Sequence, residues 1–415
     1  MSCVMNHLQR VVTFRLFTIV VLLVVPMILV FLYGRTHCQY EALYGFETSL
    51  ERRTHVAPLT VIKNEPAKPP DLIKKKKKTI LYWTKMFSSK NFYFSERGED
   101  GDIFANCPVS FCMGTNDRNY QPVEEYDALL FHGPELNARD LPKRRSPNQR
   151  YIFMDSETQV FHPVPNRPEF NNFFNWTMAY RRDADIMRPY GVFRKLGTNE
   201  VIPPYIPAQW LNVSDGKVSE STRLLFKKKS KMAAWFVSHC GTNSKRENIA
   251  EKLQKYMTVD IYGKCGKLQC SRANEDECYE QLEEGYFFYL SFENSLCRDY
   301  ITEKVYRILD YDVIPIVYGA VDYETYLPPN SYINVMDFPS IEALANFLTE
   351  LSKDEERYLS YFKWKSFYKV DTRKHYIVCE FCEALHDPHL PKQVVANIYD
   401  WWAKGSQCVP PLEIN

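Results

Sequence analysis

The sequence has no marked excess of charge of either sign. Its 52 basic side chains balance 51 acidic ones, which leaves a formal net charge of +1. A near-neutral chain gives no general reason to expect a nucleic acid or an anionic surface as partner. The one dense charge block is the run Lys74–Lys78, which is typical of a solvated linker edge. We therefore expect no nucleic-acid partner.

The sequence also lacks any internal repeat, which excludes a repeat architecture. Its 415 residues are enough for two domains with separate cores. Residues 34–77 are poor in apolar periodicity and contain NEPAKPPD, so we interpret them as a stalk. The folded part is expected to begin at TILYW, residues 79–83.

The longest run without charge is LFTIVVLLVVPMILVFLY, residues 16–33. At ~1.5 Å per residue it nearly spans a bilayer core of roughly 30 Å. Arg10 and Arg15 precede it and no acid does, so the tail 1–15 is expected to stay in the cytosol. A cleaved signal peptide is the alternative, but the run is longer than such a core usually is, and no small-x-small cleavage site follows. We predict an uncleaved signal-anchor, with the chain after Gly34 in the lumen.

Cysteine usage fits an oxidising lumen. Of 12 cysteines, Cys3 is cytosolic in this topology and Cys38 lies just beyond the membrane. A zinc site at CEFC, residues 379–382, is an alternative use of two others, but a lone C-x-x-C lacks a second pair at ligand spacing. We therefore favour five disulfide bridges among the remaining ten: Cys107, Cys112, Cys240, Cys265, Cys270, Cys278, Cys297, Cys379, Cys382 and Cys408.

Two N-glycosylation sequons also suit a luminal protein. They are Asn175-Trp176-Thr177 and Asn212-Val213-Ser214. A glycan requires an exposed asparagine, so we expect Asn175 and Asn212 at the surface.

The pattern of apolar residues predicts an α/β fold in two parts. In a first domain, 78–215, short strands are expected at 79–83, 126–131 and 151–154. In a second domain, 216–368, strands and helices alternate, which is typical of a parallel sheet flanked by helices. Its expected strands are 233–238, 258–263, 286–292, 313–317 and 331–335. Its expected helices carry apolar faces through Ile249, Leu253, Tyr256 and Met257, through Ile301, Val305, Ile308 and Leu309, and through Ile341, Leu344, Ala345, Leu348 and Leu351. A cysteine-containing segment, 369–415, follows.

Charged residues occur where two of these helices begin. In parallel sheets, ligands bind beyond the carboxyl ends of the strands, next to the following helix starts. Arg246 lies in the first turn of one helix, and Glu303 and Lys304 lie in the first turn of another. Free backbone N–H groups, the helix dipole and added cations suit a diphosphate. Taken singly, each of these residues is more often a solvated surface residue.

The stretch FENSLCRDYITEK, residues 292–304, and the later VIPIVYGAVDYETYLPPNSYINVMDF resemble the signature region of the α1,3-fucosyltransferases. The resemblance extends upstream through VDIYGKCG, AAWFVSHC, NWTMAYRRDADIMRPYG and YIFMDSE, and so covers most of residues 79–385. The expected tail, anchor and stalk also match the Golgi layout of that family.

The resemblance implies the GT-B arrangement of two facing Rossmann-like domains, with GDP-fucose held by the C-terminal one. It implies an inverting transfer, from a β-linked donor to an α-linked product. Carried over by position, Arg246 and Lys304 would hold the diphosphate and Glu303 would contact the fucose. The residues implied to shape the donor pocket are Tyr300, Asn294 and Glu293.

An inverting transfer needs a base for the acceptor hydroxyl. In the family this is a carboxylate just after a strand of the N-terminal domain, and the matching stretch here is MDSETQ, which implies Glu157. The neighbours of Glu157 depart from the family pattern F-E-S-P. Asp155 is the alternative base, because two residues apart on a strand would share a face.

We do not expect an obligatory metal ion. The short patterns DAD (183–185) and DYD (310–312) resemble the D-x-D of metal-dependent glycosyltransferases but are common by chance. Arg246 and Lys304 already offer charge compensation for a diphosphate. Stimulation by Mn²⁺ is compatible with this expectation.

The acceptor is implied less directly. The segments CEFCEALHDPHLPKQVVANIYDWWAKGSQC and YGKCGKLQC are similar to invertebrate and plant enzymes that fucosylate the innermost, asparagine-linked GlcNAc of N-glycans. A Lewis-type enzyme acting on antennary GlcNAc is the alternative. Two hypotheses from other classes are a catalytically silent glycan-binding relative and a luminal hydrolase with a carboxylate pair.

Overall fold

The structure is a computed structural model, and all the residues that it describes lie in one compact unit, Asp71–Asn415. They are residues 77–92, 94, 103–270, 275–372, 375–390 and 393–414. The expected cytosolic tail, the anchor and the stalk up to residue 76 lie outside the described residues. Among the residues described, none of the helices has the length and apolar character needed to cross a bilayer.

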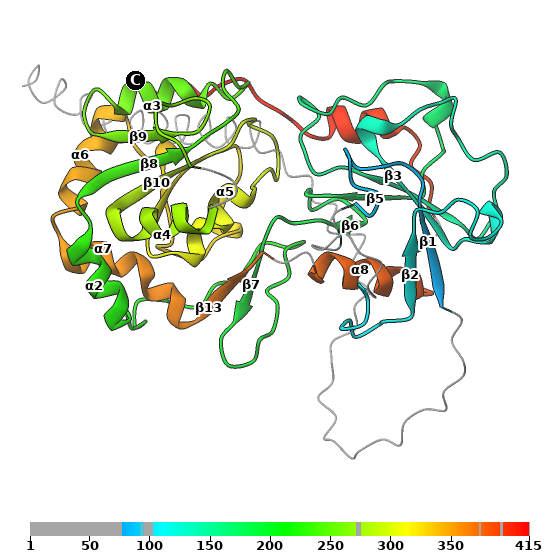
Figure 1. Ribbon diagram of the computed structural model, residues 1–415, viewed down its shortest axis with the longest axis horizontal. Coiled ribbons are helices and arrows are strands. Elements are labelled where there is room, and N and C mark those ends of the chain that lie inside the picture. Colours follow the sequence, from blue (N-terminus) through cyan, green and yellow to red (C-terminus); the bar gives the residue numbers. More distant parts are fainter. Residues whose placement is uncertain are drawn as a thin grey trace, which may run out of the picture. The chain divides into compact units, whose positions relative to one another are not determined.

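The first sheet has six parallel strands in the order β2-β1-β3-β4-β5-β6 (Figure 1). Their bounds are β1 Lys78–Tyr82, β2 Cys112–Thr115, β3 Ala128–His132, β4 Arg150–Met154, β5 Trp176–Ala179 and β6 Ile186–Met187. The central strand β3 is buried at every residue, because helices and loops cover both faces of a parallel sheet. The expected strands near 79, 126 and 151 are found as β1, β3 and β4. The other three are too short to produce a recognisable pattern.

The second sheet has five parallel strands in the order β12-β11-β10-β8-β9. Its strands are β8 Lys231–Phe236, β9 Val259–Tyr262, β10 Tyr286–Phe292, β11 Ile314–Tyr318 and β12 Ile333–Asn334. Its helices are α2 Glu220–Lys228, α3 Arg246–Leu253, α4 Glu275–Gly285, α6 Ile341–Leu351 and α7 Glu355–Leu359. The apolar face predicted for α6 packs into one core with β8, β10 and β11, and so do Ile249, Leu253 and Met257 of the face predicted for α3. That helix is shorter than expected, because it ends at Leu253, and Tyr256 is exposed. The expected α/β class with two parallel sheets is confirmed.

One expected helix is wrong in extent. The apolar face through Ile301 and Leu309 predicted a continuous helix, but α5 (Glu303–Tyr306) is a single turn, followed by a 3₁₀ turn at Ile308–Asp310. Thr302 caps α5 and therefore fixes its start after Ile301. All four apolar residues are buried nonetheless. Because one turn carries little dipole, the charge at this helix start comes mainly from side chains.

The C-terminal segment returns to the first sheet. Strand β13 (Tyr368–Asp371) pairs antiparallel with β7 (Val192–Lys195), and α8 (His375–His386) follows (Figure 1). Ile377, Val378 and Phe381 of α8 share a core with residues of β1 and β6. Helix α8, Ile398 and Trp402 therefore complete the cores of the first sheet, whereas Ile414 packs in the core of the second.

Ten cysteines form five disulfides, as expected, and the alternative of zinc binding at CEFC does not hold because both of its cysteines are bonded elsewhere. The pairs are Cys107–Cys379, Cys112–Cys382, Cys240–Cys265, Cys270–Cys278 and Cys297–Cys408. The first two join the start of the first sheet to α8.

The expectation that Asn175 lies at the surface is wrong. Its side chain is buried, and its Nδ2, the atom that would carry a glycan, donates to the Gln393 carbonyl at 3.0 Å. Its Oδ1 accepts from the Tyr151 backbone N–H at 2.9 Å. Asn175 is thus a structural link between strands and the C-terminal segment, whereas Asn212 is exposed, as a glycan requires.

We predict that the two bridges to α8 stabilise the fold non-additively. Each closes a long loop, with sequence separations of 272 and 270. Once one is present, the other closes a loop of only about eight residues. Chain entropy assigns about 2.5 kcal/mol to a loop of about eight residues and about 5.5 kcal/mol to one of about 270. Urea unfolding should therefore show that removal of either bridge alone, by a pair of Cys→Ala substitutions, lowers the free energy of unfolding only slightly. Removal of both bridges should lower it by more than the sum of the two single effects.

The pair Cys270→Ala and Cys278→Ala is the matched control, because that bridge spans eight residues and shares no loop with the others. Losses that simply add for the two α8 bridges would contradict this account.

Candidate active site

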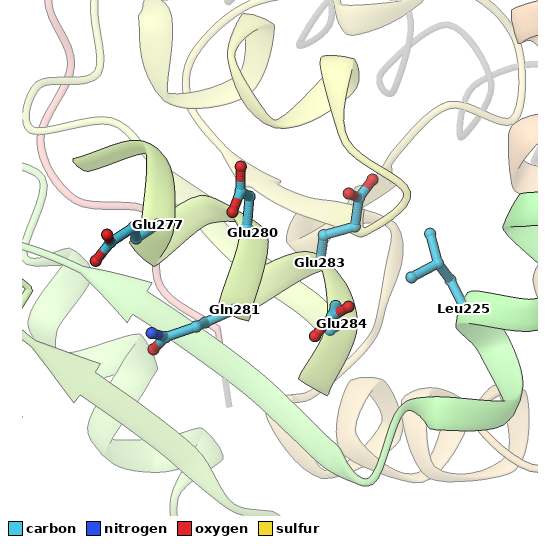
Figure 2. Close-up of a pocket in the computed structure, with 6 residues that line it drawn as sticks. All are labelled: Leu225, Glu277, Glu280, Gln281, Glu283 and Glu284. Carbon is cyan, nitrogen blue, oxygen red and sulfur yellow. The ribbon is translucent and has the colours of Figure 1, made fainter. Parts of the chain in front are cut away.

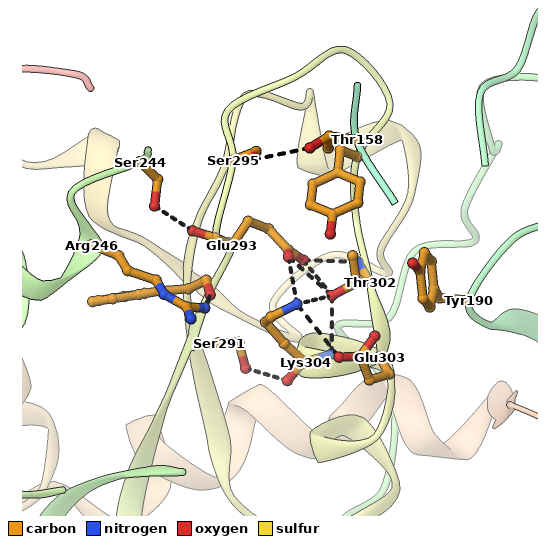
Figure 3. A network of polar contacts seen from close by, with 12 residues as sticks. Thr158, Tyr190, Ser244, Arg246, Ser291, Glu293, Ser295, Thr302, Glu303 and Lys304 are labelled. Atoms are coloured by element: carbon orange, nitrogen blue, oxygen red, sulfur yellow. Dashed lines mark hydrogen bonds and ion pairs between the residues drawn. The ribbon is translucent and has the colours of Figure 1, made fainter. Parts of the chain in front are cut away.

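The site begins where β10 ends. Glu293 follows Phe292, is 1% exposed, and accepts from the Thr302 backbone N–H at 2.8 Å and the Thr302 hydroxyl at 3.0 Å. Lys304 Nζ lies 3.1 Å from Glu293 Oε2 and donates to Thr302 Oγ1 at 2.7 Å. Figure 3 shows the ammonium group pointing at both. A carboxylate at this depth requires a countercharge, which Lys304 supplies.

The charges of this pair are tuned by burial and by each other. Burial raises the pKa of Glu293, and the positive charge of Lys304 only partly offsets that effect. Burial would lower the pKa of Lys304, but the negative charges of Glu293 and Glu303 outweigh burial and raise it. Lys304 therefore stays positively charged although its side chain is only 22% exposed.

Arg246 is the first residue of α3, as expected, but it is 4% exposed rather than solvated. Its guanidinium donates to the Phe292 carbonyl at 2.6 Å and to the His239 carbonyl at 3.1 Å. Burial lowers the pKa of Arg246, and the charge of Glu293 counteracts the effect. A buried cation thus lies at the end of β10, on the other side of that strand's carboxyl end from Lys304 (Figure 3).

Two polar atoms beside these charges have no hydrogen-bond partner in the protein, although one of them, Arg246 Nε, lies 4.0 Å from Glu247 Oε1. They are Arg246 Nε and Asn294 Oδ1, each buried. A buried polar atom without a hydrogen bond costs about 1–3 kcal/mol, so such atoms are rare away from functional sites. Their position at the carboxyl edge of the second sheet is where a ligand would satisfy them.

Glu303 differs from its neighbours. Its side chain is 57% exposed, and its Oε1 lies 3.4 Å from Lys304 Nζ. It therefore projects from the site instead of closing it, which leaves it available to a ligand.

The first sheet contributes Glu157, which follows β4. Tyr300, in the loop that follows β10, is fully buried in the core of the first sheet and donates its hydroxyl to Glu157 Oε2 at 2.7 Å. Burial raises the pKa of Tyr300 well above its ordinary value, so the phenol keeps its proton and remains a donor. Lys304 Nζ lies 6.0 Å from the centre of the Tyr300 ring. All seven residues expected at the site therefore lie around the facing ends of β4 and β10.

Asp155 does not share a face with Glu157, contrary to our expectation. Strand β4 ends at Met154, and in the turn that follows the two carboxylates have different partners. Asp155 is 0% exposed and accepts from the backbone N–H groups of Ser156 and Glu157 at 2.7 and 3.1 Å. The alternation of a strand does not apply to residues in a turn.

Three of the four aspartates of DAD and DYD have structural partners. Asp183 binds Arg181 and Arg298, while Asp185 accepts from the Thr177 backbone N–H at 2.8 Å. Asp312 binds Lys365 at 2.8 Å. Burial raises the pKa of Asp310 to about 6.

Two contributors were not predicted from the sequence. Thr302 joins Glu293 to Lys304, and its position one residue before a helix start is the signal of a capping residue. Tyr190 donates its hydroxyl to the Ser156 carbonyl and so supports the turn that carries Glu157. No local sequence signal distinguishes Tyr190 from other buried tyrosines.

A separate hollow beside α4 is strongly acidic (Figure 2). It is lined by Leu225, Glu277, Glu280, Gln281, Glu283 and Glu284. Four carboxylates would repel a diphosphate, so this hollow does not suit a nucleotide donor.

Two protein-family models match the chain. Residues 75–191 match the model described as fucosyltransferase, N-terminal, and residues 226–401 match glycosyltransferase family 10 (fucosyltransferase), C-terminal. Together they cover both sheets and the loops that form the site.

Similar curated proteins carry related names. Alpha-(1,3)-fucosyltransferase C of Drosophila melanogaster is 38% identical over 78% of this chain and 77% of that protein. Glycoprotein 3-alpha-L-fucosyltransferase A of the same organism is 34% identical over 80% of this chain and 62% of that protein. A 4-galactosyl-N-acetylglucosaminide 3-alpha-L-fucosyltransferase of Pan troglodytes is 37% identical over 69% of this chain and 72% of that protein.

A crystal structure of an α1,3-fucosyltransferase with GDP also matches. It is 17% identical, with a TM-score of 0.45, over 80% of this chain and 95% of that one. This likeness is too distant to place a ligand on individual residues.

We predict that Lys304→Met makes the free energy of unfolding depend more strongly on pH than it does in the wild type. Without Lys304, the pKa of the buried Glu293 rises further above that of the unfolded chain. The folded state then holds a proton that the unfolded chain releases, so the free energy of unfolding falls as pH rises from about 5 to 7. The free energy of unfolding should fall by about 1.4 kcal/mol for each unit by which the substitution raises the pKa of Glu293. Urea unfolding at a series of pH values measures this fall.

Lys353→Met is the control, because Lys353 pairs with Glu350 at an exposed position. Adding Glu293→Gln to Lys304→Met should remove the pH dependence. If Lys304→Met and the wild type lose stability in parallel, Lys304 does not compensate Glu293.

Proposed function

The chain belongs to glycosyltransferase family 10, the fucosyltransferases, and from this premise we propose the reaction, the acceptor and the roles of the site residues. The protein is an α1,3-fucosyltransferase that takes L-fucose from GDP-fucose, in the GT-B arrangement of two facing domains. It acts with inversion on a GlcNAc of glycoprotein N-glycans. The observation that carries the proposal is the hydrogen bond from Tyr300 to Glu157, which follows β4 of the first sheet. This bond holds the Glu157 carboxylate beside the charged residues at the end of β10.

The donor is held at the second sheet. Lys304 and Arg246 bind the diphosphate, and Glu303, the exposed acid of this end, contacts the fucose. Asn294, Glu293 and Tyr300 shape the pocket. Arg246 Nε and Asn294 Oδ1, which have no hydrogen-bond partner in the protein, support this assignment, because a bound nucleotide sugar satisfies them.

The chemistry follows from where charge develops. The acceptor oxygen attacks the anomeric carbon of fucose while the bond from that carbon to the phosphate oxygen breaks, and its electron pair leaves with GDP. Glu157 takes the proton from the acceptor hydroxyl. Positive charges on Lys304 and Arg246 stabilise the leaving diphosphate more strongly as the bond breaks, which lowers the barrier.

We propose that the reaction needs no obligatory metal ion. The two cations supply the charge compensation that an ion provides in metal-dependent transferases, and three of the four aspartates of DAD and DYD, namely Asp183, Asp185 and Asp312, are engaged by arginine, lysine and backbone groups. Mn²⁺ stimulation is compatible with this proposal.

The proposed acceptor is the innermost, asparagine-linked GlcNAc. The likeness of the C-terminal segment to core-type enzymes and the 34% identity to the Drosophila glycoprotein 3-alpha-L-fucosyltransferase A support it. The 37% identity to the chimpanzee 4-galactosyl-N-acetylglucosaminide enzyme supports antennary GlcNAc as the second candidate. The proposed location is the Golgi membrane, with residues 16–33 as a type II anchor and the catalytic part in the lumen.

We predict that Glu157→Gln abolishes transfer but leaves GDP affinity nearly intact. The amide keeps the size of the side chain and can still accept from Tyr300, but it cannot take a proton. A general base is worth about 10²–10⁴ in rate. Turnover with GDP-fucose, together with calorimetric GDP binding, measures both effects.

Lys304→Met should differ from it, because loss of this cation should both weaken GDP binding and slow turnover. Glu169→Gln is the neutral control, because Glu169 is exposed. A Glu157→Gln variant that turns over normally would refute Glu157 as the base.

We predict that the luminal part transfers fucose to a chitobiose core and not to a core-blocked glycan with free antennae. Products from a panel of core-only and antennary glycans can be separated by mass spectrometry with linkage analysis. Fucose on the antennae alone would refute the core proposal and favour the second candidate. No transfer to any acceptor would refute both.

A further inference from the structure

The turn that carries Glu157 is organised by a buried acid. Asp155 Oδ1 accepts from the backbone N–H groups of Ser156 at 2.7 Å and Glu157 at 3.1 Å, and it contacts His162 Nδ1 at 2.7 Å. Three donors thus converge on one oxygen. Because Asp155 is 0% exposed, an acceptor hydroxyl has no access to it.

His162 returns to Asp155 through a tight local turn. Its backbone N–H donates to the Thr158 carbonyl at 2.8 Å, and its own carbonyl accepts from Trp402 Nε1 at 2.9 Å. The Thr158 hydroxyl in turn donates to Ser295 of the second sheet's loop at 3.1 Å. The segment from Asp155 to His162 is therefore fixed at both ends, with Glu157 between them.

We propose that Asp155 and His162 are positioning residues for the catalytic base, and that the hydrogen bond from His162 Nδ1 to Asp155 holds the Glu157 carboxylate against Tyr300. The inference deepens the proposed function and depends on Glu157 being the base. It also assigns Asp155 a supporting role instead of the catalytic one.

The charges around this pair agree with the assignment. Burial would raise the pKa of Asp155, but the nearby His132 imidazole, whose Nε2 lies 3.7 Å from Asp155 Oδ1, and the hydrogen bond from His162 outweigh it and hold the pKa below its ordinary value. An ionised carboxylate can only accept, so His162 Nδ1 is the donor. The charged groups that face His162 are Asp155, Glu157 and Glu135.

The same cluster could be read as a metal site, because His132, Asp155 and His162 place ligand atoms within 4.8 Å of one another. The geometry favours hydrogen bonding. Two ligands of one zinc ion lie about 3.3 Å apart when each bond is about 2.0 Å. His162 Nδ1 and Asp155 Oδ1 are 2.7 Å apart, which is a hydrogen-bond distance.

Substitutions at His162 test the inference through the position of one donor atom. The Nδ2 of asparagine lies as many bonds from the backbone as histidine Nδ1, whereas the Nε2 of glutamine lies one bond further. We expect His162→Leu to lower kcat about 10²-fold, the typical effect of a misplaced catalytic group, with the KM for GDP-fucose unchanged. His162→Asn should restore most of kcat, and His162→Gln should not.

Asp155→Asn keeps an accepting oxygen and should retain measurable transfer under conditions in which Glu157→Gln is inactive. His389→Asn, at an exposed histidine, is the control. GDP binding and thermal unfolding of each variant show whether it is folded.

Three outcomes would overturn the inference. They are an unchanged kcat in His162→Leu, equal kcat in the Asn and Gln variants, and a stoichiometric metal ion in purified protein that His162→Asn loses. A wild-type protein without any transfer would refute the proposed function itself, and this inference with it.

Discussion

The hydrogen bond from Tyr300 to Glu157 is the contact on which the arrangement of the site depends. It joins a fully buried phenol in the loop that follows β10 to a carboxylate in the turn that follows β4. A buried hydroxyl that loses its acceptor costs about 1–3 kcal/mol, so the two loops are more stable together than apart. The adjacent bond from Thr158 to Ser295 acts in the same direction. A base contributed by one sheet is thereby held beside a donor site built on the other.

The second constraint is that the charged side chains at the end of β10 compensate one another's charge with little help from water. Glu293, Lys304 and Arg246 are all largely withdrawn from solvent, and each changes the pKa of another. One buried carboxylate between two cations leaves one positive charge in excess, and the exposed Glu303 lies to the side. In the proposed reaction, the diphosphate of the donor binds to a site that has a small excess of positive charge and a fixed geometry. As the leaving group gains charge, cations that are already in place need no reorganisation to stabilise it.

The sequence allowed the second sheet to be predicted much better than the first, for a physical reason. Strands such as β10, with seven buried residues, and helices such as α6 repeat an apolar pattern long enough to recognise. Strands β2, β5 and β6 have four, four and two residues, and tertiary contacts define them. The buried Asn175 and the single turn of α5 likewise depend on distant partners, Gln393 and Glu293, that local sequence does not reveal.

In the candidate site, too, some features could be predicted from the sequence and others depend on tertiary contacts. The rule that ligands bind at the carboxyl ends of parallel strands located Arg246 and Lys304 correctly beside Glu293. The rule could not show that Arg246 is buried, because its acceptors, the carbonyls of Phe292 and His239, are set by the fold. Resemblance pointed to Glu157, and the sequence could not show that Asp155 is buried and accepts from three donors.

The last residues of the chain connect these observations. Trp402 donates to the carbonyl of His162 on the side of the base, and Cys408 is bonded to Cys297 on the side of the donor. Ser406 accepts from the Arg298 backbone N–H at 2.9 Å, two residues before Tyr300. A segment outside both sheets therefore contacts the loop of each catalytic partner. Because a displacement of about 1 Å is enough to slow a positioned reaction about 10²-fold, these distant contacts belong to the geometry of the reaction as much as the groups that touch the sugar.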